Sequence, residues 1–196
     1  MEGSSLAPAP VVAPAGPREH LVLPVLVVIA VLAVVVLGGY VVGGALSTPA
    51  GPPVEVVAGV RVQPLSGWEV AGRFGEPTPG VRLTRGSGNL DVVAVPFDGS
   101  PSDLANGYVT KVLEPEADRL SVSRDVETVE LASGLQAVRF AYVGVFGKAQ
   151  VPIEGEVTAV VSPSGTGVVF DGWAPQGMLR YAVGDVRTMV EGAAIA

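Results

Sequence analysis

Residues 154–175 read EGEVTAVVSPSGTGVVFDGWAP, and they contain two apolar runs rich in β-branched residues, separated by turn residues. We expect strands over 154–162 and 167–173. The loop S-G-T-G at 164–167 has neither the spacing of a phosphate-binding loop nor a helix after it. Because its glycines supply the positive φ that tight turns need, it is typical of a hairpin turn. These residues predict an antiparallel hairpin.

Further strands are predicted on both sides of this hairpin. Two pairs of runs flank short turns, one at 64–67 and one at the loop R-G-S-G-N (85–89), and each pair is typical of another hairpin. The predicted strands outside 154–175 cover residues 54–62, 68–74, 81–84, 90–96, 121–131 and 135–146.

Two helices separate and close the runs of strands. Ser100, Pro101 and Asp103 provide a capping hydroxyl, a proline at the first helical position and an acid in the first turn. Pro115 should end or kink this helix near Glu114. Apolar residues at helical spacing predict a second, C-terminal helix: Met178, Leu179, Ala182, Val183, Val186, Met189 and Val190. The order of elements predicts an α+β domain, a mostly antiparallel sheet covered by two helices.

An uncharged apolar run precedes this domain. Residues 21–46 read LVLPVLVVIAVLAVVVLGGYVVGGAL, about 39 Å of helix against a hydrocarbon core of about 30 Å. The run is longer than a signal-peptide core, and residues 1–20 are a poor basic leader, so we expect a retained transmembrane helix. The alternative is a cleaved signal, because Gly43 and Ala45 are small residues that a signal peptidase accepts. Arg18 precedes the run, and the first base after it is Arg61, which predicts a cytoplasmic N-terminus.

The predicted protein is therefore a single-pass plasma-membrane protein with four parts. Residues 1–20 form a disordered cytoplasmic Pro/Ala tail, 21–46 the span, 47–53 a linker and 54–196 an extracytoplasmic domain. Within the span, Gly39 and Gly43 are spaced so that two helix backbones can approach closely, which favours a homodimer. The alternative is that these glycines reflect the ordinary composition of transmembrane helices.

Composition excludes several classes of function. The chain has a net charge of −7 and no cysteine, and its one histidine, His20, precedes the apolar run. An acidic domain without a basic cluster argues against nucleic acid as a partner. Without Cys or His, the domain cannot form a Ser-His-Asp or Cys-His nucleophile or a cysteine zinc site. We therefore predict no enzymatic activity, no cofactor and no metal.

Carboxylates are the remaining candidates for chemistry. Glu154 and Glu156 share one face of a predicted strand, and Asp171 lies in the next strand across the hairpin. If the three met, they could act as general acid and base or bind Ca²⁺. The interpretation that we favour is a solvated strand face, because no D-x-D-x-D loop is present.

The two tryptophans receive different interpretations. Trp68 follows a turn, and we expect it in the core beneath a helix. Trp173 stands in D-G-W-A-P-Q-G, where flanking Gly and Pro make it a candidate for an exposed contact surface as well. A core position is the alternative for Trp173, and it is the one that we favour.

The element order and the stretches "GWEVAGRF", "VRLTRGSGNLDVVAVPF", "GLQAVRFAYVGVF" and "EGEVTAVVSPSGTGVVFDGWAP" resemble small actinobacterial membrane-anchored proteins with a PsbP-like ectodomain. The resemblance implies an α/β/α sandwich that serves as a binding or assembly module without a shared catalytic set. Some relatives are lipoproteins, but this chain lacks the cysteine that a lipid anchor needs. No family site residue can be transferred to it.

The sequence thus favours a non-enzymatic binding or scaffolding module of the bacterial cell envelope, with an unknown envelope protein or lipid as partner. A scaffold predicts a filled core and an exposed apolar patch. The first alternative is a carrier of an apolar ligand, with a cavity of about several hundred Å³ between sheet and helix, lined by Phe140, Tyr142, Val186 and Met189. The second alternative, a carboxylate-dependent hydrolase, predicts two carboxylates within about 5–10 Å in a cleft.

Overall fold

The computed structural model describes residues 51–148 and 150–196. The predicted tail, span, most of the linker, and Gly39 with Gly43 lie outside the described residues. Among the helices within the described ranges, none is long and apolar enough to cross a bilayer.

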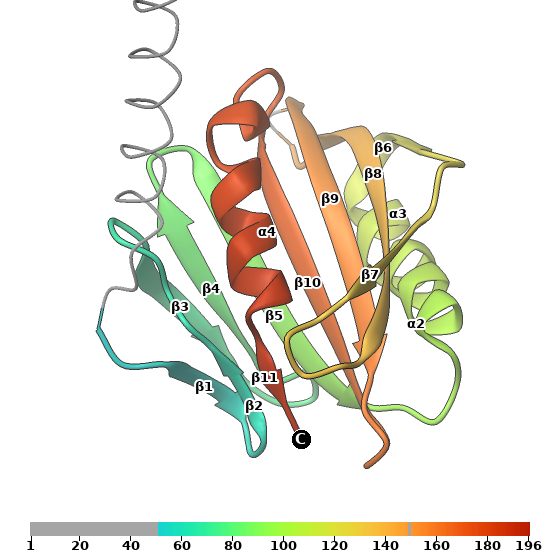
Figure 1. Ribbon diagram of the computed structural model, residues 1–196. Coiled ribbons are helices and arrows are strands. Elements are labelled where there is room, and N and C mark those ends of the chain that lie inside the picture. The colour runs from blue at the N-terminus through green and yellow to red at the C-terminus, as the bar shows by residue number, and fades with distance from the viewer. Residues whose placement is uncertain (1–50, 149) are drawn as a thin grey trace, which may run out of the picture. The chain divides into compact units, whose positions relative to one another are not determined.

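The large sheet has eight strands, and all of its pairs are antiparallel (Figure 1). The order is β3-β4-β5-β10-β9-β8-β6, and β7 also pairs with β8. The predicted mostly antiparallel sheet is confirmed. Its strands are β3 (Glu69–Phe74), β4 (Gly80–Arg85), β5 (Gly88–Pro96), β6 (Ala117–Val122), β7 (Glu127–Glu130), β8 (Gln136–Phe146), β9 (Val151–Val161) and β10 (Thr166–Pro175).

Two predicted hairpins are confirmed, and glycine explains both turns. β9 and β10 pair around Gly165, whose φ is +80°, and the N–H of Ser162 donates to the carbonyl of Thr166 at 2.9 Å. β4 and β5 pair around Gly86, whose φ is +58°. A left-handed φ costs glycine little because it has no Cβ.

The predicted hairpin between 54–62 and 68–74 is wrong. The first range itself folds into a hairpin of β1 (Val54–Val57) and β2 (Val60–Val62), because Gly59 reverses the chain at φ +85°. Strand β2 then pairs with β11 (Ala194–Ile195) in a separate three-stranded sheet. β3 pairs with β4 instead.

The single strand predicted over 121–131 is also wrong. The chain forms β6, turns at residues 123–126, where the N–H of Asp125 donates to Ser123 Oγ at 3.1 Å, and continues as β7. Both strands pair with β8, one beside each half of it. Strand β8 is long enough, at 11 residues, to hold two partners in succession.

The first predicted helix begins where its cap predicts. It comprises α2 (Pro101–Tyr108), a π-helical stretch η1 (Val109–Leu113) and α3 (Glu114–Glu116). The N–H of Asp103 donates to Ser100 Oγ at 3.1 Å, and the N–H of Ser100 donates to Asp103 Oδ2 at 3.2 Å, a complete capping box. The helix ends at Glu116, one residue beyond Pro115.

The C-terminal helix is shorter than predicted. A 3₁₀ turn, η2 (Leu179–Tyr181), precedes α4 (Val183–Glu191). Met178, which the spacing places on the buried face, is 40% exposed, whereas Val186 and Met189 are buried. The helical spacing therefore identified the buried face of α4 but not its start.

The two helices lie on opposite faces of the large sheet (Figure 1). Because side chains alternate along a strand, neighbours in β10 serve different layers. Val168 and Phe170 pack with α4 and the small sheet, and Val169 packs with α2. The layer under α2 determines the site described next.

Candidate functional site

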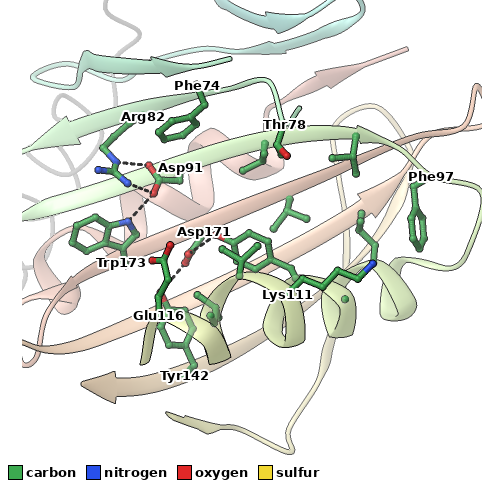
Figure 2. A pocket seen from close by; sticks show the side chains of 18 of the residues that line it. Phe74, Thr78, Arg82, Asp91, Phe97, Lys111, Glu116, Tyr142, Asp171 and Trp173 are labelled. Atoms are coloured by element: carbon green, nitrogen blue, oxygen red, sulfur yellow. Dashed lines mark hydrogen bonds and ion pairs between the residues drawn. The ribbon is translucent and has the colours of Figure 1, made fainter. Parts of the chain in front are cut away.

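A pocket of about 880 Å³ lies between the sheet and the first helix (Figure 2). Its floor comes from β4, β5, β8, β9 and β10, and one wall comes from α2, η1 and α3. Most of the residues that line the pocket are apolar, and polar side chains from both the floor and the wall project into the pocket. The apolar lining includes Phe74, Val93, Val95, Phe97, Leu104, Val112, Leu113, Phe146, Ile153, Val169 and Trp173.

Three charged residues form a row across the pocket floor. Arg82 on β4 lies opposite Asp91 on β5, and Asp91 lies opposite Asp171 on β10. Directly opposed residues of antiparallel strands project to the same face. The neighbours of this row along each strand, such as Val92 and Phe170, point into the α4 layer instead. We call Arg82, Asp91 and Asp171 the charged row.

Arg82 and Asp91 form a bidentate ion pair. Arg82 Nε lies 2.6 Å from Asp91 Oδ1, and Arg82 Nη2 lies 2.7 Å from Oδ2. Trp173 Nε1 also donates to Asp91 Oδ2, at 3.1 Å. The guanidinium lies 5.5 Å from the ring centroid of Phe74 and 5.3 Å from that of Trp173. The hydrogen bonds from Arg82 to Asp91 raise the pKa of Arg82, so the guanidinium stays charged in this pair.

Asp171 has different partners. Tyr108 Oη donates to Asp171 Oδ2 and Tyr142 Oη donates to Oδ1, each at 2.9 Å. Asp171 is 3% exposed, and this burial raises its pKa from an ordinary 3.8 to about 7. Burial beside this carboxyl also raises the pKa of both tyrosines, which therefore remain protonated donors.

Tyr142 reaches Asp171 because of a glycine on the neighbouring strand. Gly155 on β9 lies opposite Tyr142, and the tyrosine ring occupies the space that a Cβ of residue 155 would need. Any larger residue there would displace the ring. The pattern E-G-E in the sequence thus has a packing function at the pocket floor.

The helix wall contributes Lys111 and Glu116 at different ends of the pocket. In Figure 2, Glu116 lies at the Asp171 end, whereas Lys111 extends its nitrogen toward Phe97. The π-helical stretch that holds Lys111 is closed by the bond from the N–H of Glu114 to the carbonyl of Val109. Such wide turns are frequent at functional sites. Apart from Pro115, no residue in the sequence marks this one.

The cluster of Glu154, Glu156 and Asp171, which was the alternative interpretation of these acids, does not form. The favoured interpretation, a solvated strand face, is wrong for Glu156 and Asp171, because both are buried. Asp171 lies opposite Val157, so it projects to the face opposite that of the two glutamates. Glu156 instead pairs with Arg187 and with Arg139, whose Nε lies 3.3 Å from its Oε1. Glu154 Oε1 accepts the backbone N–H of Leu179 at 2.8 Å, which positions the start of η2. Among residues 51–148 and 150–196, no group of three or more His, Cys, Asp or Glu side chains is placed to bind a metal ion.

The four residues predicted to line a carrier pocket divide between the two faces. Phe140 and Tyr142 pack in the α2 layer, and Val186 and Met189 pack in the α4 layer. That residue set is therefore wrong, because α4 packs closely on its face. Of the four, only Tyr142 lines the large pocket, which lies under the other helix.

The two tryptophans differ in their burial. Trp68 is 4% exposed and belongs to the α4 layer, which confirms its core position. Its Nε1 donates to Asp185 Oδ2 at 2.9 Å. Trp173 is partly exposed and lines the pocket beside the charged row.

Sequence reasoning missed Arg82, Asp91 and Tyr108 as site residues. The available signal was a charged residue inside an otherwise apolar strand, as in LDVVAV for Asp91 and VVFDGW for Asp171. A buried charge usually has a partner or a function. Its partner, however, depends on which strands become neighbours.

Comparisons with known proteins bear on the fold. No family model and no curated protein matches the chain. Cyanobacterial PsbP (CyanoP) from Synechocystis matches at 13% identity and TM-score 0.54, covering 74% of this chain and 92% of that chain. The Saccharomyces cerevisiae Ran-binding protein Mog1p matches at 11% identity and TM-score 0.53, covering 76% of this chain and 96% of that chain. LpqN of Mycobacterium tuberculosis, which is involved in cell envelope biogenesis, matches at 16% identity and TM-score 0.51, covering 74% of this chain and 90% of that chain. The fold is therefore PsbP-like and Mog1-like, which confirms the resemblance at the level of structure.

Proposed function

We propose that this chain is a non-enzymatic binding module of the bacterial cell envelope, held at the membrane by residues 21–46 with residues 54–196 outside. We further propose that it binds an apolar or amphipathic ligand in the pocket under α2. The volume of about 880 Å³ carries this proposal, because ligand pockets typically measure about 300–1,000 Å³. A scaffold that binds only through its surface would not need such a cavity.

The polar groups of the pocket support binding rather than hydrolysis. Asp91 and Asp171 are cross-strand neighbours in a pocket, which is the arrangement expected of a carboxylate pair. Asp91, however, is held by two bonds from Arg82 and one from Trp173. A carboxylate held in this way is a poor nucleophile or base. The folds shared with LpqN, Mog1p and CyanoP are consistent with a binding role.

A photoreactive ligand tests the pocket. A long-chain alcohol carrying a diazirine would be added to membranes that contain the full chain, and the labelled residues would be mapped by mass spectrometry. We expect labels on the lining of the pocket. In the variant Gly107→Phe, we expect the new ring to enter the pocket, because Gly107 lines it and a Cβ there meets no atom within 4 Å.

Gly184→Phe is the matched control. Gly184 is also a helical glycine with open space around its Cβ position, but it lies in α4, away from the pocket. We expect Gly107→Phe to remove the pocket labels and Gly184→Phe to retain them. Equal labelling of the pocket in both variants would show that it is not the ligand site.

A further inference from the structure

The charged row at the polar end of the pocket holds one cation, Arg82, for two carboxylates, Asp91 and Asp171. Both nitrogens that Arg82 directs at the charged row bond to Asp91, at 2.6 and 2.7 Å. Among the ion pairs of the described residues, none includes Asp171. Asp171 therefore faces the pocket with no positive charge of its own.

The hydrogen bonds to Asp171 are those of a carboxylate. Both of its oxygens accept a hydrogen bond from a phenol hydroxyl, one from Tyr108 and one from Tyr142. The ionised carboxylate accepts freely at both oxygens, whereas the neutral acid carries a proton on one oxygen, and this proton would itself need an acceptor. Yet the residue is 3% exposed, and a buried carboxylate without a cation is costly. This cost appears as its pKa of about 7. A cation entering the pocket would remove it.

The charges of the rest of the pocket indicate the orientation of such a ligand. Glu116 adds a third acid at the Asp171 end, beside Asp91 and Asp171, and Lys111 lies at the opposite end near Phe97 (Figure 2). A positively charged group is therefore attracted to the Asp171 end and repelled from the Lys111 end. Between the ends lie the apolar side chains of Val93, Val95, Leu104 and Val169.

We propose that the ligand is an amphiphile with a protonated amine, which binds Asp171 while its apolar chain runs between α2 and the sheet toward Phe97. This inference rests on the proposed function and adds the class of ligand. An ammonium group donates up to three hydrogen bonds and so can bond to Asp171 while its chain extends away. A divalent metal ion fits less well, because Ca²⁺ takes about six to eight oxygen ligands.

Binding of an amine should depend on pH through Asp171. The groups that face Asp171 are Tyr108 from α2, Tyr142 from β8, Asp91 from β5, Arg82 from β4 and, at the rim, Glu116 from α3. The tyrosines stay protonated and Arg82 stays charged near neutral pH. The amine requires ionised Asp171, so its apparent affinity should rise about tenfold per pH unit below pH 7 and level off above it.

Calorimetric titration of the full chain in lipid nanodiscs tests this proposal, with empty nanodiscs as the blank. The probes are hexylammonium, 1-hexanol and hexanoate, which share a chain length and differ in charge. We expect hexylammonium to bind at least about tenfold more tightly than hexanol near pH 8 and about 30-fold more tightly near pH 8 than near pH 5.5. Hexanol should show no such pH dependence, and hexanoate should bind least.

Asp171→Asn should reduce the affinity for hexylammonium to that for hexanol and abolish its pH dependence. Glu130→Gln is the control, because Glu130 is an exposed acid on β7 outside the pocket.

If the wild-type chain binds hexylammonium and hexanol equally at both pH values, or prefers hexanoate, the amine proposal is overturned and the pocket remains a ligand site. If no probe binds and the diazirine alcohol labels nothing in the pocket, the proposed function fails as well. The wild-type comparison decides the proposal even if the Asn variant does not fold.

Discussion

Replacing Asp171 by Asn should make the domain more stable at neutral pH. Burial raises the pKa of Asp171 from an ordinary 3.8 to about 7. The folded state therefore holds this proton more tightly than the unfolded state does. The free energy of unfolding falls as the pH rises from about 4 to about 7, and Asp171 causes no further change above that range. At 1.36 kcal/mol per pKa unit, the loss is about 4 kcal/mol.

Asparagine resembles the neutral acid in shape and has no proton to lose. We expect wild type and Asp171→Asn to have similar free energies of unfolding near pH 4 and the variant to be about 4 kcal/mol more stable near pH 8. Urea unfolding of the full chain in non-ionic micelles, followed by tryptophan fluorescence, measures this difference, because both tryptophans lie in the domain. Asp98→Asn, at an exposed position, controls for loss of an acid. A difference between wild type and Asp171→Asn that stays constant from pH 4 to 8 would refute the reasoning.

Three further predictions address the helices and the span. Ser100→Ala removes the acceptor of the Asp103 N–H and should lower the free energy of unfolding by about 1 kcal/mol, measured by the urea midpoint; no change would mean that the cap is dispensable. Gly172→Ala places a Cβ 2.5 Å from Val186 Cγ1 and should lower the thermal midpoint by pushing α4 outward; an unchanged midpoint would contradict this packing. Gly39→Ile should abolish self-association of the span in a membrane reporter, and an unchanged signal would exclude the homodimer.

The fold was predictable where a local signal was decisive. Gly86 and Gly165 mark turns between apolar runs, and Ser100 with Asp103 marks a helix start, so these elements follow from short-range chemistry. The prediction failed at 54–62, where VEVVAGVRV alternates as one strand would. The turn that contains Gly59 lies between Val57 and Val60, and so short a turn does not interrupt the alternation of apolar residues. The prediction failed at 121–131 because the turn at residues 123–126 contains neither Gly nor Pro to mark it.

The site was less predictable than the fold. Asp171 was recognised as a candidate, but it was grouped with Glu154 and Glu156, the acids of the preceding predicted strand. Its actual neighbour, Asp91, comes from a strand that precedes it by about eighty residues in sequence. Which strands become neighbours depends on the packing of the whole sheet, and short-range patterns do not contain that information.

The charged row also limits how the strands can align. If β10 slipped by one residue against β5, every side chain of β10 would move to the other face. Asp171 would then enter the layer that now holds Val168 and Phe170, without the hydroxyls of Tyr108 and Tyr142. Such misaligned states are therefore penalised. Apolar replacements along the row could preserve stability yet allow a mixture of alignments, so the residues that we assign to binding also help to ensure that the chain has a single native structure.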